Sequence, residues 1–143
     1  MNEIILAQIA TAIIGTAIAA WQDWKTGLIS DVIAYAMMAI AFIGLFFNPQ
    51  PTSLELITIG GFAIIIAIGW IASQKQIIGW GDVLILAGIH ALLPSLYTVT
   101  TIMAFALILV TLFKYGLKIE RKEIRLMPYI FIGLLFYLFI SLF

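Results

Sequence analysis

Long runs without any charged residue dominate this sequence and limit what it can fold into. They include residues 4–21, 32–47, 56–73, 83–113 and 127–143. A helix of about 20 mostly apolar residues is long enough to cross a hydrocarbon layer about 30 Å thick. Hydrophobic residues make up 64% of the 143 residues and charged ones only 10%, which is more apolar surface than a soluble core of this size can bury. We therefore expect an integral membrane protein, with the lipid bilayer as a partner.

The run over residues 83–113 is too long for one helix, since it would extend about 46 Å. Pro94-Ser95 is the natural break, because proline lacks an amide donor and restricts the residue before it. Residues 83–93 alone are too short to span, so we expect this helix to extend backward through residues 77–82, with Asp82 below the membrane surface. The sequence thus predicts a single polytopic, all-α domain over residues 1–143 with six transmembrane helices.

The basic residues predict the orientation of these helices. All seven lie in the first, third and fifth connections: Lys25, Lys75, Lys114, Lys118, Arg121, Lys122 and Arg125. Because connections rich in lysine and arginine stay in the cytoplasm, the odd-numbered connections should be cytoplasmic and both termini outside. We expect a multi-pass protein of the plasma membrane.

The charge balance and the scarcity of metal ligands exclude several classes of function. Seven basic and seven acidic residues give no compositional reason to expect a nucleic-acid partner. The absence of cysteine excludes disulfides, thiolate metal sites and a cysteine nucleophile, and a single histidine excludes a histidine-rich metal site. We expect neither a metal nor a cofactor.

A few acidic residues lie beside or inside the expected spans, where an ionisable group costs a few kcal/mol and is a candidate site. They are Asp23, Asp31, Glu55 and Asp82. Glu55 is explained by its position at a helix N-terminus, and Asp31 either caps the second helix or contacts a substrate. Asp82 follows Gly79-Trp80-Gly81, and two glycines loosen a helix at a depth where backbone groups must be satisfied by protein or a wet cavity.

Asp23 and Asp82 are expected at the same cytoplasmic side. Asp23 alone could be a juxtamembrane charge paired with Lys25, but two carboxylates in one wet pocket suggest an aspartyl protease. Such a pair shares one proton, so that one acid activates water and the other protonates the scissile carbonyl. The serines have no histidine near them in the sequence, and we expect His90 to be a packed or hydrogen-bonded helix residue.

Two segments of the chain resemble the signatures of the type IV prepilin peptidases, a family of GxGD membrane aspartyl proteases that includes the archaeal preflagellin peptidases. They are residues 23–31, DWKTGLISD, and residues 79–86, GWGDVLIL. Residues 125–129, RLMPY, resemble the proline-containing segment that opens the family's last helix. The resemblance covers nearly the whole chain, with six helices in the expected order.

The resemblance implies a hydrolase of the aspartic endopeptidase type, with Asp23 and Asp82 as the catalytic pair. Gly79 and Gly81 would form the active-site bend beside the second acid. The implied substrate is a prepilin-like or archaellin-like precursor, cut at the cytoplasmic face between a short basic leader and an apolar helix. Asp31 and Lys25 are candidate substrate contacts.

Two residues depart from the family pattern. Ser30 stands where proline is usual, and Leu84 stands where many members have lysine. The chain also lacks the cysteine-bearing cytoplasmic insert of the long bacterial forms, so it resembles the short, peptidase-only kind.

Two further interpretations stay open. The basic stretch over residues 114–125 is expected to face anionic lipid headgroups rather than a substrate. The alternative function is a small transporter, or a membrane scaffold, in which Asp82 binds a proton or a cation and no bond is cut, because glycine-broken helices with a buried carboxylate also serve transport.

Overall fold

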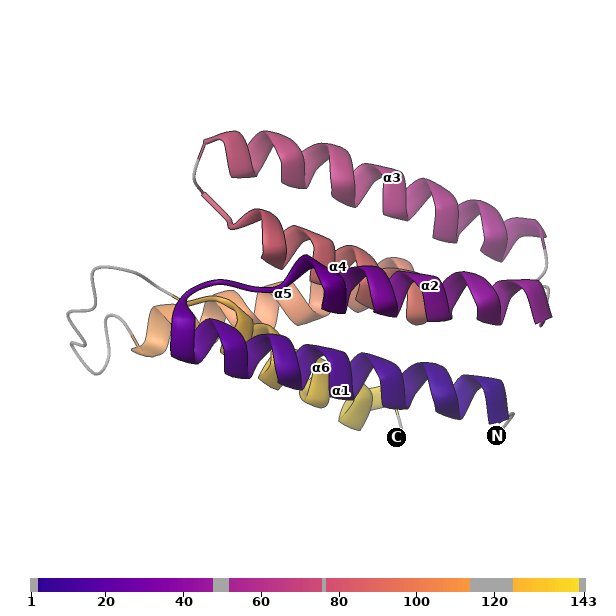
Figure 1. Ribbon diagram of the computed structural model, residues 1–143, viewed down its shortest axis with the longest axis horizontal. Helices are drawn as coiled ribbons and strands as arrows, with labels where there is room; N and C mark the ends of the chain where they lie inside the picture. Colours follow the sequence, from indigo (N-terminus) through magenta and orange to yellow (C-terminus); the bar gives the residue numbers. More distant parts are fainter. Residues whose placement is uncertain (1–2, 48–51, 76, 114–124, 142–143) are drawn as a thin grey trace.

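The computed structural model describes residues 3–47, 52–75, 77–113 and 125–141, and these residues form an all-helical bundle (Figure 1). Its six helices are α1 (Glu3–Thr26), α2 (Asp31–Phe47), α3 (Thr52–Gln74), α4 (Trp80–Leu92), α5 (Leu96–Thr111) and α6 (Met127–Ser141). The predicted all-α class, the six helices and the break at Pro94-Ser95 are confirmed. In the described part of the chain, Glu3–Thr26 and Leu56–Gln74 are long and apolar enough to cross a membrane by themselves, and the other helices are apolar but shorter.

The order of packing puts α4 at the centre of the bundle. It packs against α2 on one side and α3 on the other and also contacts α1 and α5, while α6 joins α1 to α5. The C-terminus of α1 and the N-terminus of α4 lie at the same end of the bundle, on the left of Figure 1. Residues 23 and 82, which are far apart in the sequence, are therefore at one end.

Helix α4 is shorter than the sequence predicted. The extension back through residues 77–82 is wrong for residues 77–79, because Gly79 has the extended conformation (φ −69°, ψ 144°) of an N-cap and the helix begins at Trp80. Glycine favours a helix boundary over a helix interior. With 13 residues, α4 is about 20 Å long. It has no need to span alone, since every residue from Asp82 to Leu92 is buried by the other helices.

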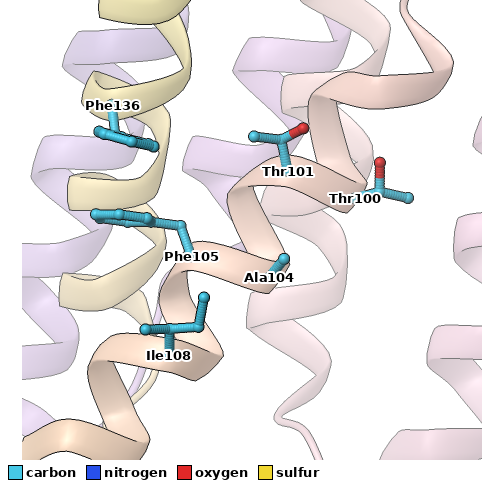
Figure 2. Close-up of a pocket in the computed structure, with 6 residues that line it drawn as sticks. All are labelled: Thr100, Thr101, Ala104, Phe105, Ile108 and Phe136. Carbon is cyan, nitrogen blue, oxygen red and sulfur yellow. The ribbon is translucent and has the colours of Figure 1, made fainter.

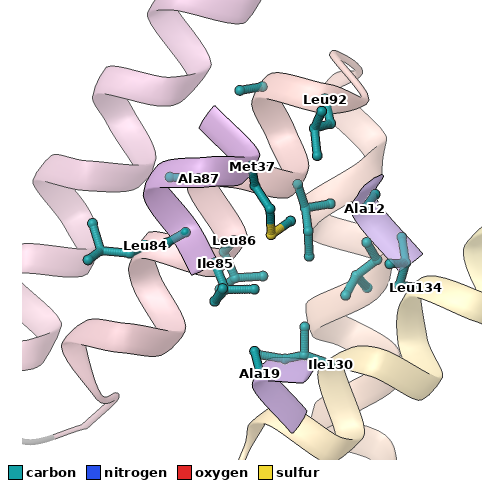
Figure 3. Packing of buried hydrophobic residues seen from close by; sticks show 14 of the residues in the cluster. Ala12, Ala19, Met37, Leu84, Ile85, Leu86, Ala87, Leu92, Ile130 and Leu134 are labelled. Carbon is teal, nitrogen blue, oxygen red and sulfur yellow. The ribbon is translucent and has the colours of Figure 1, made fainter. Parts of the chain in front are cut away.

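The core forms where α4 meets its neighbours (Figure 3). A helix that is apolar on all sides has to be enclosed by others, and α4 supplies Ile85, Ile89 and Leu92 to the largest fully buried side chains. Small residues let the backbones approach: Gly88 of α4 faces Met37 of α2. The enclosed α4 thus provides a rigid support for Asp82 in its first turn.

Helix α3 lies at the edge of the bundle and touches α4 through two glycines. His90 of α4 fills the space beside Gly61, and Val83 fills the space beside Gly69. His90 is buried, and its Nε2 lies 3.4 Å from the carbonyl oxygen of Ile57. The prediction that His90 is a packed, hydrogen-bonded helix residue is confirmed.

Candidate active site

Asp23 stands in the last turn of α1, close to where that helix is stopped. The stop is Gly27, whose φ of 72° is a left-handed conformation that glycine adopts without strain. The Gly27 N–H donates to the carbonyl oxygen of Asp23 at 2.9 Å, as in helices that end in a left-handed residue. The sequence DWKTG therefore places an acidic side chain at the end of the first helix, where it is only 6% exposed.

The start of α6 holds Asp23 from a second direction. The backbone N–H of Met127, the first residue of α6, donates to Oδ2 of Asp23 at 3.2 Å. The guanidinium Nη1 of Arg125 donates to the main-chain oxygen of Asp23 at 2.7 Å and to that of Trp24. Segment 125–127 thus binds both the side chain and the main chain of one acidic residue.

Asp82 is held by its own helix. With Gly79 as N-cap, Asp82 is the third residue of α4, and the backbone of Gly79 is its hydrogen-bond partner. This is the return contact of a capping box, in which the third helical residue reaches back to the N-cap amide. A carboxylate at this position also complements the positive end of the helix dipole. The GxGD order therefore explains how α4 begins as well as where its acid points.

One carboxylate oxygen of Asp82 is not used in this contact. Asp82 is 8% exposed, and in the described part of the chain its Oδ1 is buried without any hydrogen-bond partner. A buried acceptor of this kind costs about 1–3 kcal/mol and is uncommon unless a site needs it. The charges of Asp82 and Asp23 are close enough to repel each other. The structure thus brings the two predicted acids into one buried cluster.

The two glycines before Asp82 are both closely packed, and Gly81 lets the connection between α1 and α2 approach the start of α4. A Cβ on Gly81 would lie 2.9 Å from Cβ of Ile29, and one on Gly79 would lie 3.0 Å from Oδ2 of Asp82. Both distances are shorter than ordinary carbon contacts allow. Through Ile29, the segment between α1 and α2 therefore packs directly on Gly81 in the first turn of α4.

The chemistry available to this cluster is that of paired acids. Two carboxylates this close, away from water, cannot both be ionised easily and tend to share a proton. The pair can then take a proton from one group and give a proton to another in the same event. Within the described residues, no group of three or more histidines, aspartates or glutamates lies close enough together to hold a metal ion.

The two candidate substrate contacts lie outside the buried cluster. Asp31 is exposed at the first position of α2. Lys25 is also exposed, and its Nζ lies 4.4 Å from the centre of the Trp21 ring. Neither side chain joins the buried cluster of Asp23 and Asp82.

The two departures from the family pattern have different surroundings. The backbone N–H of Ser30 donates to Oε1 of Gln22 at 3.0 Å, a hydrogen bond that proline could not form. Leu84 is buried in the hydrophobic core, so its side chain is part of the packing around α4. Gln22 thus fixes the connection at the position where the family pattern has a rigid residue.

Arg125 is the site residue whose contacts the sequence did not reveal. The basic stretch over residues 114–125 was expected to face lipid headgroups; residues 114–124 lie outside the described residues, and for Arg125 the expectation is wrong, because its guanidinium donates to carbonyl oxygens of α1. The sequence contained one signal. A cation just before a helix N-terminus opposes the helix dipole and needs a partner elsewhere.

A groove of about 370 Å³ lies along α5 and α6 (Figure 2). It is lined by Thr100, Thr101, Ala104, Phe105, Ile108 and Phe136. The stacked rings of Phe105 and Phe136, with centroids 4.0 Å apart, form one wall. None of the candidate site residues lines this groove, so it is separate from the acidic cluster.

A comparison with known families shows which family the chain belongs to. The type IV leader peptidase family matches residues 10–142, a range that includes both acids and all three resembling segments. The chain belongs to the type IV leader peptidase family. No curated protein and no solved structure matches it. Membership makes this leader peptidase homologue a peptidase of a membrane-associated family that acts on prepilin-type precursors.

Proposed function

We propose that this leader peptidase homologue is an aspartic endopeptidase in which Asp23 and Asp82 are the catalytic pair. The observation that carries the proposal is Oδ1 of Asp82, a buried oxygen that has no hydrogen-bond partner among the described residues and lies in the same cluster as a second buried carboxylate. A structural acid would have both oxygens satisfied. An acid that must accept or donate a proton during a reaction keeps one oxygen available.

The hydrogen bonds favour different roles for the two acids. Burial disfavours the charge of Asp23, and the Met127 N–H and the nearby charge of Arg125 oppose that effect. Asp82 keeps Oδ1 available for the shared proton. In the proposed mechanism Asp23 takes a proton from water, the water oxygen attacks the scissile carbonyl carbon, and Asp82 gives its proton to the carbonyl oxygen. When the tetrahedral intermediate collapses, Asp23 passes the proton it took to the leaving nitrogen, the C–N bond breaks, and a hydroxyl of the intermediate returns a proton to Asp82.

The end of the bundle that holds Asp23 and Asp82, here called the acidic end, offers an exposed acid, Asp31, to a basic leader. Asp23, Asp31 and Asp82 all lie in the first or last turn of a helix at this end. Exposed Asp31 is placed to meet the cations of the leader, and Lys25 is a second candidate contact. The precursor's apolar helix would stay in the lipid while its leader reaches the acids, so the cut falls between the two.

We further propose that the six helices cross the plasma membrane, with the acidic end in the cytoplasm and both termini outside. Lys25, Lys75 and Arg125 of the odd-numbered connections lie at the acidic end. All four tryptophans also lie in helical turns near this end, and each side chain is more than a third exposed: Trp21, Trp24, Trp70 and Trp80. Tryptophan is enriched at the membrane–water boundary.

Labelling with a membrane-impermeant thiol reagent tests this orientation without background, because the chain has no cysteine. Thr26→Cys should react only after the membrane is permeabilised. Tyr97→Cys, at the opposite end, should react from outside. Labelling of Thr26→Cys from outside would reverse the proposed topology.

The function is tested by cleavage in lipid vesicles. The purified protein is mixed with a precursor that has a basic leader and an apolar helix, and the products are weighed by mass spectrometry. The wild type should release the leader at one bond, Asp82→Asn should not, and Glu3→Gln should match the wild type, since Glu3 is an exposed acid at the other end of α1. An intact precursor, together with proton flux that depends on Asp82, would favour the transporter alternative.

A further inference from the structure

Arg125 lies beside the acidic cluster and has no role in the proton transfers of the proposed mechanism. Its Nη1 donates to two main-chain oxygens in the last turn of α1, those of Asp23 and Trp24. The last carbonyls of a helix have no partners inside that helix, and the guanidinium adds a second donor to the Asp23 oxygen, which also accepts the Gly27 N–H. Arg125 therefore caps the C-terminus of α1 from the N-terminal side of α6.

The position of Asp23 makes this cap unusual. The capped residue is also the one whose carboxylate accepts the Met127 N–H. Two contacts from residues 125–127 thus fix both the main chain and the side chain of residue 23, more than 100 positions earlier in the sequence. When the main chain of a helix end is fixed at the same place as its side chain, the carboxylate has little freedom to turn away.

Electrostatics adds a second reason for an arginine here. The negative end of the α1 dipole disfavours a carboxylate in its last turn. The Arg125 charge acts on Asp23 and opposes that effect. Lys25, the cation nearest to Asp23 along the chain, lies over the Trp21 ring instead. The compensating charge is therefore Arg125.

We propose that Arg125 is a positioning residue of this active site, which holds the end of α1 so that the Asp23 carboxylate faces Asp82. The inference rests on the proposed function for its catalytic meaning, while the cap itself is independent of it. Misplacing a reacting group by about 1 Å can cost up to about a hundredfold in rate. Loss of the cap should thus slow the chemical step and leave substrate binding intact.

The test compares the kcat and KM of Arg125→Gln and Arg125→Lys with those of the wild type in lipid vesicles. Lys75→Gln is the control, because it removes a different cation at the same end of the bundle. We expect Arg125→Gln to lower kcat by about ten- to a hundredfold with KM within about twofold. Arg125→Lys, which keeps the charge but not the planar guanidinium that donates to two carbonyl oxygens, should recover only part of kcat, and Lys75→Gln should match wild type. A raised KM with unchanged kcat would make Arg125 a substrate contact and overturn the proposal.

Hydrogen–deuterium exchange reads the cap without any substrate. Amides at residues 24–30 should exchange faster in Arg125→Gln than in wild type, while those of α3 should not change. If Arg125→Gln does not fold, Arg125→Lys decides: faster exchange confined to residues 24–30 supports the proposal, and unchanged or uniformly faster exchange overturns it. If the wild type cleaves no precursor, the proposed function fails and the exchange result still decides whether Arg125 holds α1.

Discussion

Asp82 stands at the N-terminus of α4 and Asp23 at the C-terminus of α1, so the helix dipole acts on the two carboxylates with opposite sign. Asp82 is stabilised by its own helix, through the dipole and the backbone of Gly79. Asp23 needs help from elsewhere, and the first residues of α6 provide an amide and a guanidinium.

This difference shows that local sequence positions one acid of the cluster and tertiary contacts position the other. The position of Asp82 follows from four consecutive residues and the burial of α4. The position of Asp23 depends on contacts between the two ends of the chain. Changes near Asp82 should therefore act through its helix start, and changes near Asp23 should act through contacts with other segments.

The largest effect should come from the acids themselves, because the proposed mechanism uses both of them in one reaction. Asp23→Asn and Asp82→Asn should each lower the rate of precursor cleavage by about a thousandfold or more, and the double variant should be no slower than either. Initial rates in vesicles measure this. Additive losses would mean that the two acids act in separate steps.

The next effect concerns the start of α4. Gly81→Ala places a Cβ against Ile29, and we expect a loss of about ten- to a hundredfold in kcat/KM because Asp82 shifts with its helix. Ile29→Gly in the same chain should restore much of the rate, because it removes the Cβ that lies closest to the added methyl group. Gly60→Ala is the control, since a Cβ there has no neighbour within 4 Å. A Gly81→Ala enzyme with full activity would separate the bend from catalysis.

A smaller effect is expected at the end of α1. Gln22→Ala removes the hydrogen bond to the Ser30 N–H, worth about 1 kcal/mol, and should lower the rate by about fivefold. In a Ser30→Pro background, which lacks that N–H, Gln22→Ala should have no further effect. The four rates form a double-mutant cycle. Equal losses from Gln22→Ala in both backgrounds would show that Gln22 acts through another contact.

The smallest effect, none within error, is expected from a chelator. Two carboxylates without histidine or cysteine partners make a poor zinc site. Cleavage rates before and after dialysis against EDTA should be equal. A loss that added zinc or magnesium restores would require a metal between the two helix ends.

The two acids also differ in how far the sequence could predict them. Hydropathy predicted six helices, because charges and Pro94-Ser95 separate the apolar runs, but it overextended α4 by treating it as a lone span rather than an enclosed helix. The two glycines before Asp82 predicted a loosened helix there, since cap and acid are only three residues apart in the chain. The contacts of Arg125 could not be predicted, because neither hydropathy nor residue spacing shows which carbonyl oxygens a guanidinium far away in the sequence will bind.

The pH dependence of kcat/KM tests most directly whether Asp23 and Asp82 act as one pair. It should be measured in lipid vesicles, with a precursor that has no titratable group near the cut. The account predicts a rate that rises and then falls with pH, with both limbs belonging to the coupled pair, because catalysis needs one ionised and one protonated acid. A rate that keeps rising into the alkaline range would show that no protonated acid is required and would contradict the proposed mechanism.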